Sequence, residues 1–387
     1  MPEANDTAWA RLRVNKATTP HEREAVFRLR YRIVVEEMGK RPPGANHGKK
    51  TLSDELDAVA NTFYLADGDE AVAALRSVPA AKAPSSRQIQ FYEVDKMPEV
   101  PREAITFTSR LILAPEWRGT RALGMLLGAV YEDSRRTGTW LDLVNVTPSL
   151  VALYEVMGYR RFLPSVMDPE AGLCFPMAMV ADDVEYLTQV CSPFAPLADR
   201  FANDPKHGRW FAARFAEYAQ PSCARVMGAD EFWRYLTERI HVEDYPLLRG
   251  LTQEQVKHVL GAGSVVRVAK GGAVVRTGEP GNDMYMVLSG ALEVRAGTRE
   301  SSRVLETLGT GQIFGEMSFL SNKPRTADVI AVSDAEVLLL TRDYLERLTQ
   351  AAPAIASRLL MNLSVYLVER LQHTTQGLLE RAPAGQA

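Results

Sequence analysis

The first part of the chain, to about residue 180, alternates between helical and strand-like spacing of its hydrophobic residues. FRLRYRIVVEEMG (27–39) and ALGMLLGAVYEDSRR (122–136) have apolar residues three or four apart, which predicts helices with one buried face. NTFYLA, EAVAALRSV and FTSRLILA are instead rich in residues that favour strands. The mixture of the two patterns is typical of an α/β or α+β domain.

The pattern changes after PLLRGLT (246–252). Short runs of β-branched residues follow at intervals of about eight to twelve residues, separated by glycine-rich turns: SVVRV, AVVRTG, MYMVLSG, ALEVRAG and VLETLG. In ALEVRA, Leu292 and Val294 share one face, as in a half-buried strand. These features predict a small β-barrel or jelly roll, followed by a helix beyond Tyr344 whose leucines are spaced by four.

We therefore predict an α+β fold of two domains. A mixed sheet flanked by helices should occupy residues 1–182, and a β jelly roll with flanking helices residues 241–375. Residues 183–240 are aromatic, helix-prone and interrupted by prolines, so we expect a connecting helical segment there. Residues 376–387 end in RAPAGQA and are expected to form a flexible tail.

Composition narrows the classes of partner without naming one. With 46% hydrophobic and 24% charged residues, the chain has the composition of an ordinary globular protein. Its formal charge of −3 gives no overall attraction to nucleic acid or to an anionic membrane, so an anion must be bound locally. No apolar run has the length of a signal-peptide core or a membrane span, and we expect a cytoplasmic protein.

The cysteines and histidines predict neither a disulfide framework nor a metal site. None of the three cysteines is in C-x-x-C spacing, and the six histidines lack the spacing of metal ligands. Reduced thiols are therefore expected.

One short stretch, FGEMSFLSNKPRTADVIA (314–331), places the acid Glu316 directly after Gly315, and Arg325 after a proline further along. A buried phosphate needs backbone N–H groups at a helix start and a fixed positive fork, which Gly315 and Arg325 are suited to provide. A phosphate would repel the carboxylate of Glu316, so we expect that carboxylate to accept a hydrogen bond from a hydroxyl. A ribose 2′-hydroxyl meets this requirement, and the pair therefore suits one small sugar phosphate.

Residues 245–375 resemble a cyclic nucleotide-binding domain, as in protein kinase A regulatory subunits, bacterial catabolite activators and nucleotide-gated channels. The resemblance is carried by GEPGNDMYMVLSGALEV (278–294), by FGEMSFLSNKPRTA (314–327) and by the closing helix. It implies that Glu316 holds the ribose hydroxyl and that Arg325 holds the cyclic phosphate. It implies a nucleotide-binding set, with cAMP ahead of cGMP as ligand, of Gly315, Glu316, Met317, Ser318, Arg325 and Thr326. A barrel that keeps its packing but binds nothing is the alternative interpretation.

Two pieces of the front half resemble the donor-binding half of the GNAT acyltransferase superfamily: PEWRGTRALGMLLGAVYEDSRRTG (115–138) and TPSLVALYEVMGYRRF (147–162). In that superfamily two parallel strands splay apart around the pantetheine arm of the donor, and the loop after the first strand binds pyrophosphate. Here the loop departs from R/Q-x-x-G-x-G/A, because Arg121 and Leu123 stand where glycines belong.

The order of motifs over residues 20–180 resembles that of N-acyl amino acid synthases and acyl-homoserine lactone synthases. Their donors are often acyl carrier proteins, so the resemblance implies an acyl-CoA or the phosphopantetheine of a carrier protein as donor. Arg118, Gly119 and Arg121 are the residues expected to contact it.

The chemistry implied is attack by an amine on a thioester. A carboxylate can serve as base for the amine, and the departing thiolate gains from a proton. The resemblance implies that Asp54 and Asp57 are the base or bind the amine, and that Tyr154 lies near the leaving sulfur. It also implies that Arg76 and Arg110 bind a substrate carboxylate or organise the acids.

Structural roles are the alternatives for these residues. Asp54 in SDEL is a good helix cap, Tyr154 could be a core residue, and the two arginines could only neutralise Asp57. Three further arginines occupy alternate positions of the first predicted helix, so they do not all face one way, and most of the three are expected to be solvated: Arg28, Arg30 and Arg32.

The sequence thus predicts an N-acyltransferase regulated by a cyclic nucleotide, through closure of the final helix over the base. Two rivals remain: a cAMP-controlled protein lysine acetyltransferase that uses acetyl-CoA, and a nucleotide sensor with an inactive GNAT-like scaffold. The expected partners are the nucleotide and an acyl carrier protein, with a homodimer left open. Nucleic acid is not expected, because no helix-turn-helix fits after the final helix.

Overall fold

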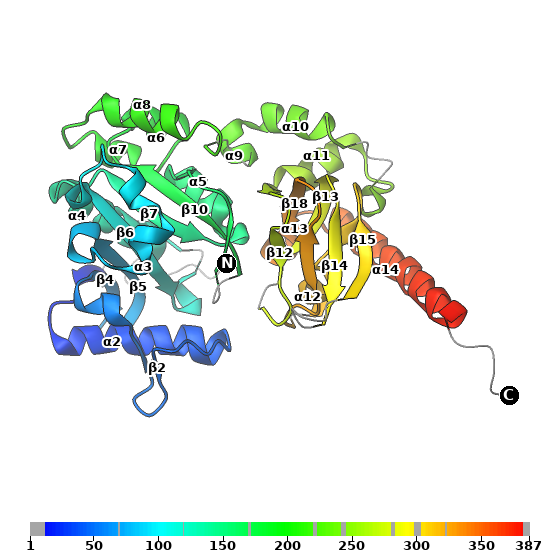
Figure 1. Cartoon of the computed structure of the whole chain (residues 1–387), viewed down its shortest axis with the longest axis horizontal. Coiled ribbons are helices and arrows are strands. Elements are labelled where there is room, and N and C mark those ends of the chain that lie inside the picture. The colour runs from blue at the N-terminus through cyan, green and yellow to red at the C-terminus, as the bar shows by residue number, and fades with distance from the viewer. Residues whose placement is uncertain are drawn as a thin grey trace. The chain divides into compact units, whose positions relative to one another are not determined.

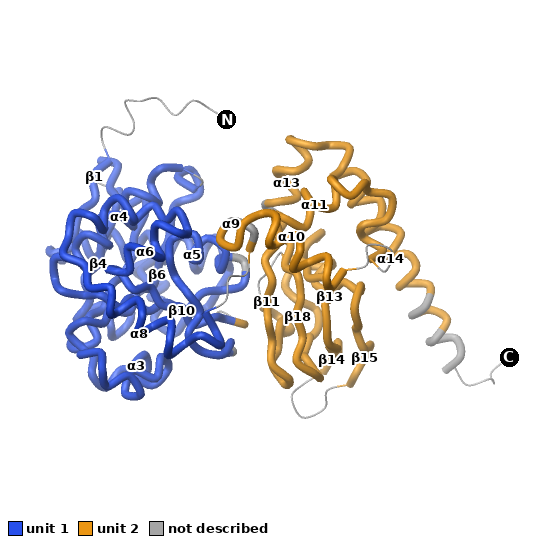
Figure 2. Tube along the Cα trace, turned by 90° about the horizontal axis from the view of Figure 1, so that it is seen from above, with its two compact units in different colours: residues 1–166, 174–220 blue, residues 167–173, 221–387 orange. Residues whose placement is uncertain are grey.

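The computed structural model divides the chain into two compact units, which are described separately (Figure 2). The structure describes residues 12–68, 70–118, 120–168, 172–219, 223–240, 245–279, 283–297, 303–321 and 323–381. The first unit comprises residues 1–166 and 174–220, and the second comprises residues 167–173 and 221–387. This division falls inside the segment that we expected to connect two domains, and the expected domain limits stay predictions.

A mixed sheet forms the centre of the first unit (Figure 1). In its described part the strand order is β1-β4-β5-β6-β7-β10-β8, with β9 beside β10. The strands are β1 (Arg13–Lys16), β4 (Asn61–Asp67), β5 (Glu70–Pro79), β6 (Ile105–Leu113), β7 (Leu141–Val146), β8 (Arg160–Arg161), β9 (Val166–Asp168) and β10 (Gly172–Val180). A separate hairpin joins β2 (Ala45–Asn46) to β3 (Thr51–Leu52). The strands predicted from NTFYLA, EAVAALRSV and FTSRLILA are confirmed as β4, β5 and β6.

Helices flank this sheet, and their ends follow local sequence signals. They are α2 (Pro20–Tyr31), α3 (Arg87–Phe91), α4 (Ala122–Arg136), α5 (Val151–Met157), α6 (Val184–Gln189), α7 (Ala195–Ala198) and α8 (Pro205–Arg214). Helix α2 begins at a capping box between Thr19 and Glu22 and continues into a π-helix, η1 (Arg32–Glu37). Helix α5 ends at Gly158, whose φ of 106° is open to glycine at little cost.

Strands β6 and β7 separate along their length, which opens the sheet at its centre. They pair in parallel at three positions only: Ile105 with Leu141, Thr106 with Asp142, and Phe107 with Leu143. Strand β6 nevertheless continues to Leu113, and β7 to Val146. The neighbouring pairs β5–β6 and β7–β10 are antiparallel.

The second unit is a sandwich of two four-stranded sheets in the part that the structure describes (Figure 1). One sheet has the order β11 (Ser264–Val268), β18 (Ala335–Leu340), β13 (Met284–Ser289) and β16 (Ile313–Phe314). The other has the order β12 (Ala273–Val275), β17 (Asp328–Ala331), β14 (Leu292–Ala296) and β15 (Arg303–Leu308). The predicted buried face of β14 is confirmed, since Leu292 is 0% and Val294 7% exposed.

Helices pack against this sandwich and share its core. They are α9 (Ala224–Met227), α10 (Ala229–Thr237), α11 (Gln253–Gly261), α12 (Glu316–Ser321), α13 (Arg342–Ala351) and α14 (Pro353–Arg381). Leu359 and Leu363 of α14 are buried in one apolar cluster with Met286 of β13 and Phe319 of α12. Helix α14 runs to Arg381, so it occupies part of the range that we expected to be a flexible tail.

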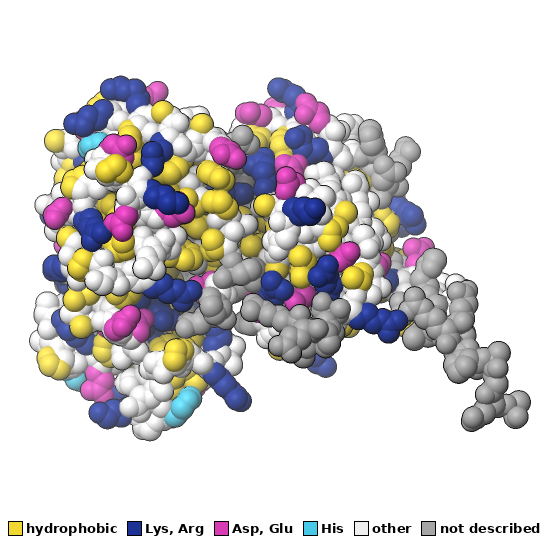
Figure 3. Space-filling model, in the orientation of Figure 1, with side chains coloured by type: hydrophobic (Ala, Val, Ile, Leu, Met, Phe, Trp, Pro, Cys, Tyr) yellow, Lys and Arg dark blue, Asp and Glu magenta, His cyan; other side chains and the backbone are white. Residues whose placement is uncertain are grey.

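Short single turns of 3₁₀ helix connect many of these elements. They are η2 (Glu55–Ala58), η3 (Ala80–Lys82), η4 (Val94–Lys96), η5 (Arg102–Ala104), η6 (Pro115–Trp117), η7 (Pro148–Leu150) and η9 (Pro246–Leu248). A search of the described helices found none with the length and apolar character that a membrane span requires. On the face drawn in Figure 3, acidic and basic side chains are interspersed, so charge alone marks no binding surface there.

Candidate functional site

The turn between β16 and α12 requires a glycine. Gly315 has φ of 81°, a left-handed conformation that residues with a Cβ adopt at a cost. A Cβ there would lie 2.8 Å from Arg325 Nη1 and 2.9 Å from the carbonyl oxygen of Asp283. The glycine therefore lets the arginine and the backbone of two strands approach one another.

Arg325 points into the second unit and not into solvent. Its side chain is buried, and Nη1 donates hydrogen bonds to the carbonyl oxygens of Asp283 (2.7 Å) and Gly315 (3.1 Å). The guanidinium carbon lies 5.8 Å from the centre of the Tyr285 ring. These contacts hold a buried positive charge beside the start of α12, with no carboxylate paired to it within the described residues.

Glu316 is also buried, at 4% exposed, and it already has a cationic partner. Arg370 of α14 donates from Nη1 to Glu316 at 2.9 Å, and its Nη2 lies 2.6 Å from Glu306 of β15. Burial raises the pKa of Glu316, and Arg370 opposes that rise. Glu316 and Arg325, the acid and the arginine of the predicted nucleotide site, are thus both buried near α12. Arg370 connects α14 to Glu316.

The other predicted nucleotide-binding residues differ in exposure. Ser318 is 2% exposed, whereas Met317 is 56% exposed and its sulfur lies 3.7 Å from Thr326 Oγ1. Sequence reasoning gave Arg370 no role. The signal that could have found it is helical spacing, because it lies four residues after the buried Tyr366, on the face that meets the sandwich.

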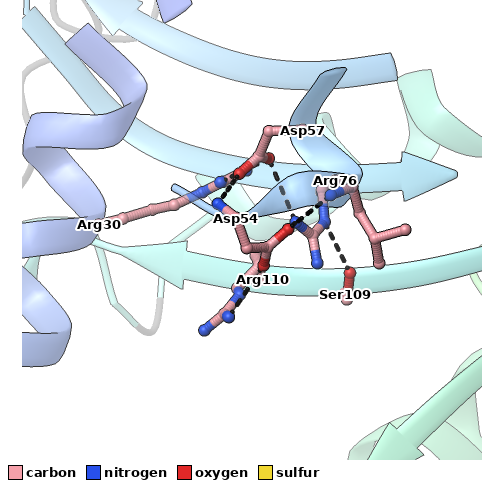
Figure 4. Close-up of polar contacts among 7 residues, drawn as sticks. Arg30, Asp54, Asp57, Arg76, Ser109 and Arg110 are labelled. Atoms are coloured by element: carbon pink, nitrogen blue, oxygen red, sulfur yellow. Dashed lines mark hydrogen bonds and ion pairs between the residues drawn. The ribbon is translucent and has the colours of Figure 1, made fainter. Parts of the chain in front are cut away.

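In the first unit, five charged side chains form one connected group, which we call the acid–arginine cluster (Figure 4). Its members are Arg30, Asp54, Asp57, Arg76 and Arg110. They come from α2, from the turn η2, and from strands β5 and β6. The structure thereby brings together four of the five residues that the sequence proposed for catalysis.

Asp54 and Asp57 are held by their own turn as well as by the arginines. Asp54 caps η2, accepting a hydrogen bond from the backbone N–H of Leu56 at 3.0 Å. Asp57 Oδ2 accepts one from the backbone N–H of Asp54 at 2.9 Å. Asp54 therefore has the capping role that we had set against catalysis, and it also pairs with Arg76.

Positively and negatively charged side chains alternate along the cluster. Asp57 Oδ1 lies 2.7 Å from Arg30 Nη1 and 3.3 Å from Arg76 Nη1. Asp54 contacts Arg76 through Oδ1 and lies 3.1 Å from Arg110 Nη2 through Oδ2. Figure 4 shows Arg30 reaching Asp57 from the left and Arg110 lying below Asp54. Arg110, at 26% side-chain exposure, is the accessible guanidinium of the three, and the side chain of Asp54 beside it is 28% exposed.

These ion pairs determine the net charge of the cluster and the pKa of Asp54. Three guanidinium groups face two carboxylates, which leaves one positive charge in excess. Burial alone would raise the pKa of Asp54, but Arg76 and Arg110 outweigh it and lower that pKa. A carboxylate with a lowered pKa is a weak base, so this site favours the binding of a substrate over proton abstraction by Asp54.

The backbone at Arg110 is unusual for a strand. Its φ is 56°, and the register of β5 against β6 shifts between Ala74 and Arg76, which marks a bulge. The bulge turns the Arg110 side chain towards Asp54. Ser109, the residue before it, accepts a hydrogen bond from Arg76 Nε at 3.1 Å.

Arg30 differs from the two arginines that alternate with it. We expected most of the three to be solvated, and Arg28 and Arg32 are exposed. Arg30 is instead 1% exposed and pairs with Asp57, and its Nε and Nη2 have no hydrogen-bond partner among the described residues. Burial lowers its pKa. Arg30 lies four residues after Val26 and three before Ile33, both buried, and this spacing is the signal that could have distinguished it.

The remaining predicted residues lie outside the cluster. Tyr154 is 7% exposed, its ring meets that of Tyr159 edge-on at 5.1 Å, and burial raises its pKa. Arg118 pairs with both carboxylate oxygens of Glu37, at 2.6 and 2.9 Å. Arg121 is exposed at the start of α4, and Gly119 lies outside the described residues.

Comparison with known families finds a different family match in each of the two units. Residues 265–352 match the model of the cyclic nucleotide-binding domain, and residues 29–128 match that of the acetyltransferase (GNAT) domain. The predicted fold class is confirmed: an α+β chain with a GNAT-type sheet domain and a cyclic nucleotide-binding sandwich. The specific resemblance to N-acyl amino acid synthases stays a prediction.

Curated relatives match part of the chain. A cyclic AMP receptor protein of Thermus thermophilus is 34% identical over 33% of this chain and 57% of its own length. A cAMP-dependent protein kinase regulatory subunit of Aspergillus fumigatus is 28% identical over 38% of this chain and 33% of its own length. The chain therefore spans little more than half of the one relative and a third of the other.

Solved structures give matches of similar extent. The catabolite activator protein of Thermus thermophilus is 31% identical, with a TM-score of 0.32, over 34% of this chain and 61% of that one. A cyclic nucleotide-binding domain from Methylobacillus flagellatus is 22% identical, with a TM-score of 0.37, over 41% of this chain and 89% of that one.

Proposed function

We propose that this protein is an N-acyltransferase whose activity is regulated by a cyclic nucleotide. The observation that carries the proposal is the presence of both sites in one chain. Buried Glu316 and Arg325 lie in a region that matches a cyclic nucleotide-binding domain. The acid–arginine cluster lies in a region that matches a GNAT domain.

The nucleotide would be held by groups of opposite sign at the two ends of the loop between β16 and β17. Arg325 offers a buried guanidinium for the cyclic phosphate, and Glu316 offers a carboxylate for the ribose 2′-hydroxyl. We favour cAMP over cGMP, in line with the cAMP named in the two curated relatives.

The acid–arginine cluster supports an acceptor that carries a carboxylate next to its amine. The cluster has one positive charge in excess, and Arg110 is its accessible guanidinium. An amino acid would place its carboxylate on Arg110, and its amine, deprotonated by water, would form a C–N bond with the thioester carbon as the C–S bond breaks. Asp54 and Asp57 would hold the arginines in place. Tyr154 would donate a proton to the departing sulfur, and water would take the remaining proton from the nitrogen and reprotonate Tyr154.

The donor would lie between β6 and β7, where the strands separate beyond Phe107 and Leu143. We propose an acyl thioester of pantetheine, carried by an acyl carrier protein or by coenzyme A. Arg118 and Arg121, which follow β6, would meet its phosphate, and Arg118 would first have to leave Glu37. The matched family description favours a second candidate, an acetyl-CoA-dependent protein acetyltransferase.

Binding of the nucleotide would act through α14. The Arg370–Glu316 pair connects this helix to the acid that we assign to the ribose, so a ligand on Glu316 competes with Arg370. Release of Arg370 would change the position of α14, and with it the connection to the first unit through residues 183–240. This is a shift between two conformational populations.

Calorimetric titration of the full chain with cAMP and cGMP tests the sensor. We expect binding that weakens about 30-fold or more in Arg325→Ala, since a hydrogen bond to a charged group contributes about 2 to 3 kcal/mol. Arg295→Ala is the matched control, because Arg295 on β14 pairs with Glu293 and not with a residue of the predicted nucleotide site. Equal affinity in the parent and Arg325→Ala would remove the nucleotide from the proposal.

Transfer assays distinguish the donors. Octanoyl-pantetheine and an acyl carrier protein loaded with octanoate are compared with acetyl-CoA, using free amino acids and lysine peptides as acceptors. We expect turnover with the octanoyl donors and free amino acids, lost in Arg110→Ala. Turnover with acetyl-CoA and lysine peptides alone would establish the second candidate instead.

A further inference from the structure

A second polar group lies in the first unit, apart from the acid–arginine cluster and with no role in the function proposed above. Asp142 on β7 is 5% exposed, and its carboxylate accepts three hydroxyl hydrogen bonds. Thr106 Oγ1 and Thr108 Oγ1 each lie 2.8 Å from Oδ1, and Tyr159 Oη lies 2.5 Å from Oδ2.

This carboxylate sits where β6 and β7 begin to separate. Phe107 and Leu143 form the last register pair of the two strands. Thr106 comes directly before that pair on β6, and Thr108 directly after it. One carboxylate oxygen therefore holds β6 on both sides of the point at which the strands part.

A buried carboxylate in this arrangement lowers the stability of the fold, so packing alone does not account for it. Within the described ranges no lysine, arginine or histidine is bonded to Asp142, and burial raises its pKa to about 6. A buried carboxylate without a cation destabilises a fold even when hydroxyls bond to it, and an asparagine of the same shape would not carry that charge. Buried titratable groups of this kind are concentrated at functional sites.

Asp142 is linked to Tyr154, the tyrosine of the proposed reaction, through the side chain of Tyr159. Its hydrogen bond fixes the Tyr159 hydroxyl, and the Tyr159 ring meets the Tyr154 ring edge-on at 5.1 Å. Tyr154 makes no side-chain hydrogen bond to another described residue. Its orientation therefore depends on packing against a ring that Asp142 holds.

We propose that Asp142 is a positioning residue for the acyl donor. Through Thr106 and Thr108 it sets the point at which β6 and β7 separate, and through Tyr159 it sets the ring on which Tyr154 packs. The inference rests on the proposed function, because the place where these strands separate is assigned there to the donor.

The charge of the network gives a signature that packing alone would not. The titratable groups facing Asp142 are Tyr154 and Tyr159, whose pKa values burial raises, so both stay protonated at neutral pH. Charged Asp142 accepts all three hydroxyl bonds, whereas protonated Asp142 must donate one hydrogen bond itself. The network, and with it donor affinity, should change as pH falls through about 6.

The experiment measures binding of S-octyl-pantetheine and of coenzyme A by calorimetry between pH 5 and pH 8, together with KM for the octanoyl donor and for the acceptor. The variants are Asp142→Asn and Thr108→Val. Thr62→Val, at a buried threonine of β4 outside the network, is the matched control. Circular dichroism and thermal unfolding check that each variant folds.

We expect donor affinity at pH 7.5 to fall about tenfold in Asp142→Asn and in Thr108→Val, with acceptor KM changed less than about twofold. Thr62→Val should match the parent. Affinity of the parent should fall below pH 6, and that of Asp142→Asn should not depend on pH over this range.

Unchanged donor affinity and an unchanged pH profile in both network variants would overturn the inference while the proposed function stands. A parent that binds neither probe and transfers no acyl group would overturn both. If Asp142→Asn fails to fold, Thr108→Val decides, since it removes one hydroxyl bond and leaves the carboxylate in place.

Discussion

At the scale of single residues, the proposed acceptor site depends on one unfavourable backbone conformation. Arg110 holds φ of 56° at a bulge in β6, and this directs its guanidinium to Asp54. A left-handed conformation costs a residue with a Cβ about 1 kcal/mol or more. The position therefore keeps a strained arginine where a glycine would be relaxed, which is the pattern expected of a residue retained for what it binds.

Replacement of Arg110 by glycine and by alanine separates strain from charge. Both variants lose the ion pair with Asp54, but only glycine relieves the backbone, so Arg110→Gly should be about 1 kcal/mol more stable than Arg110→Ala. Both should lose affinity for the carboxylate of the acceptor. Urea unfolding and acceptor KM are the measurements. Equal stability of the two variants would show that the conformation is not strained.

Asp142 gives a pH dependence of stability with a definite sign. Its pKa is about 6 in the folded chain against an ordinary 3.8, so the folded state holds the proton more tightly. Stability should therefore fall as pH rises from 4 to 6 and then level off. Asp142→Asn should lack this slope and be more stable than the parent above pH 6. Thermal unfolding of both proteins across this range is the measurement, and parallel curves would contradict it.

At the scale of elements, the repeating patterns of hydrophobic residues predicted the strands and helices. They did not predict contacts between residues that are far apart in the sequence. The strands β11 to β15 follow from alternating β-branched runs, and α4 from its apolar face. The cassette from Phe314 to Thr326 could be predicted because its residues are close in sequence. Arg370 could not be assigned in this way, because it meets Glu316 across a separation of 54 residues.

The first unit shows the same limit. Asp54, Asp57, Arg76 and Arg110 were proposed from motif order, and they meet in space. Arg30 was missed because it alternates with two other arginines, and its helical spacing from Val26 and Ile33 was not used to distinguish it. Local spacing gave no sign that Asp142 would lack a cationic partner among the described residues.

Helix α14 should limit nucleotide affinity through Arg370. Removing this side chain in Arg370→Ala frees Glu316, so nucleotide binding should tighten by roughly twofold to fivefold, as expected for loss of a partly exposed ion pair worth up to about 1 kcal/mol. Calorimetry is the measurement. Glu306→Ala is the control, since it removes the second partner of Arg370 and leaves the pair with Glu316. Weaker binding in Arg370→Ala would mean that this arginine supports the ligand.

At the scale of the whole molecule, the proposal requires that the two units communicate. Saturating nucleotide should change the rate of acyl transfer by about five- to a hundred-fold, in line with typical coupling of 1 to 3 kcal/mol. Arg325→Ala should keep the basal rate of the parent and lose the response. Steady-state rates with and without nucleotide measure this, and a parent whose rate ignores a nucleotide that it binds would contradict regulation.

The internal partner of Glu316 has a further consequence for how such a sensor is tuned. Arg370 already pairs with Glu316. The nucleotide concentration that triggers a response therefore depends on the strength of this ion pair as well as on the contacts made by the ligand. Substitutions along one face of α14 could therefore shift the threshold up or down while the phosphate-binding arginine stays as it is. Sensitivity and selectivity would then be separately adjustable properties of the same pocket.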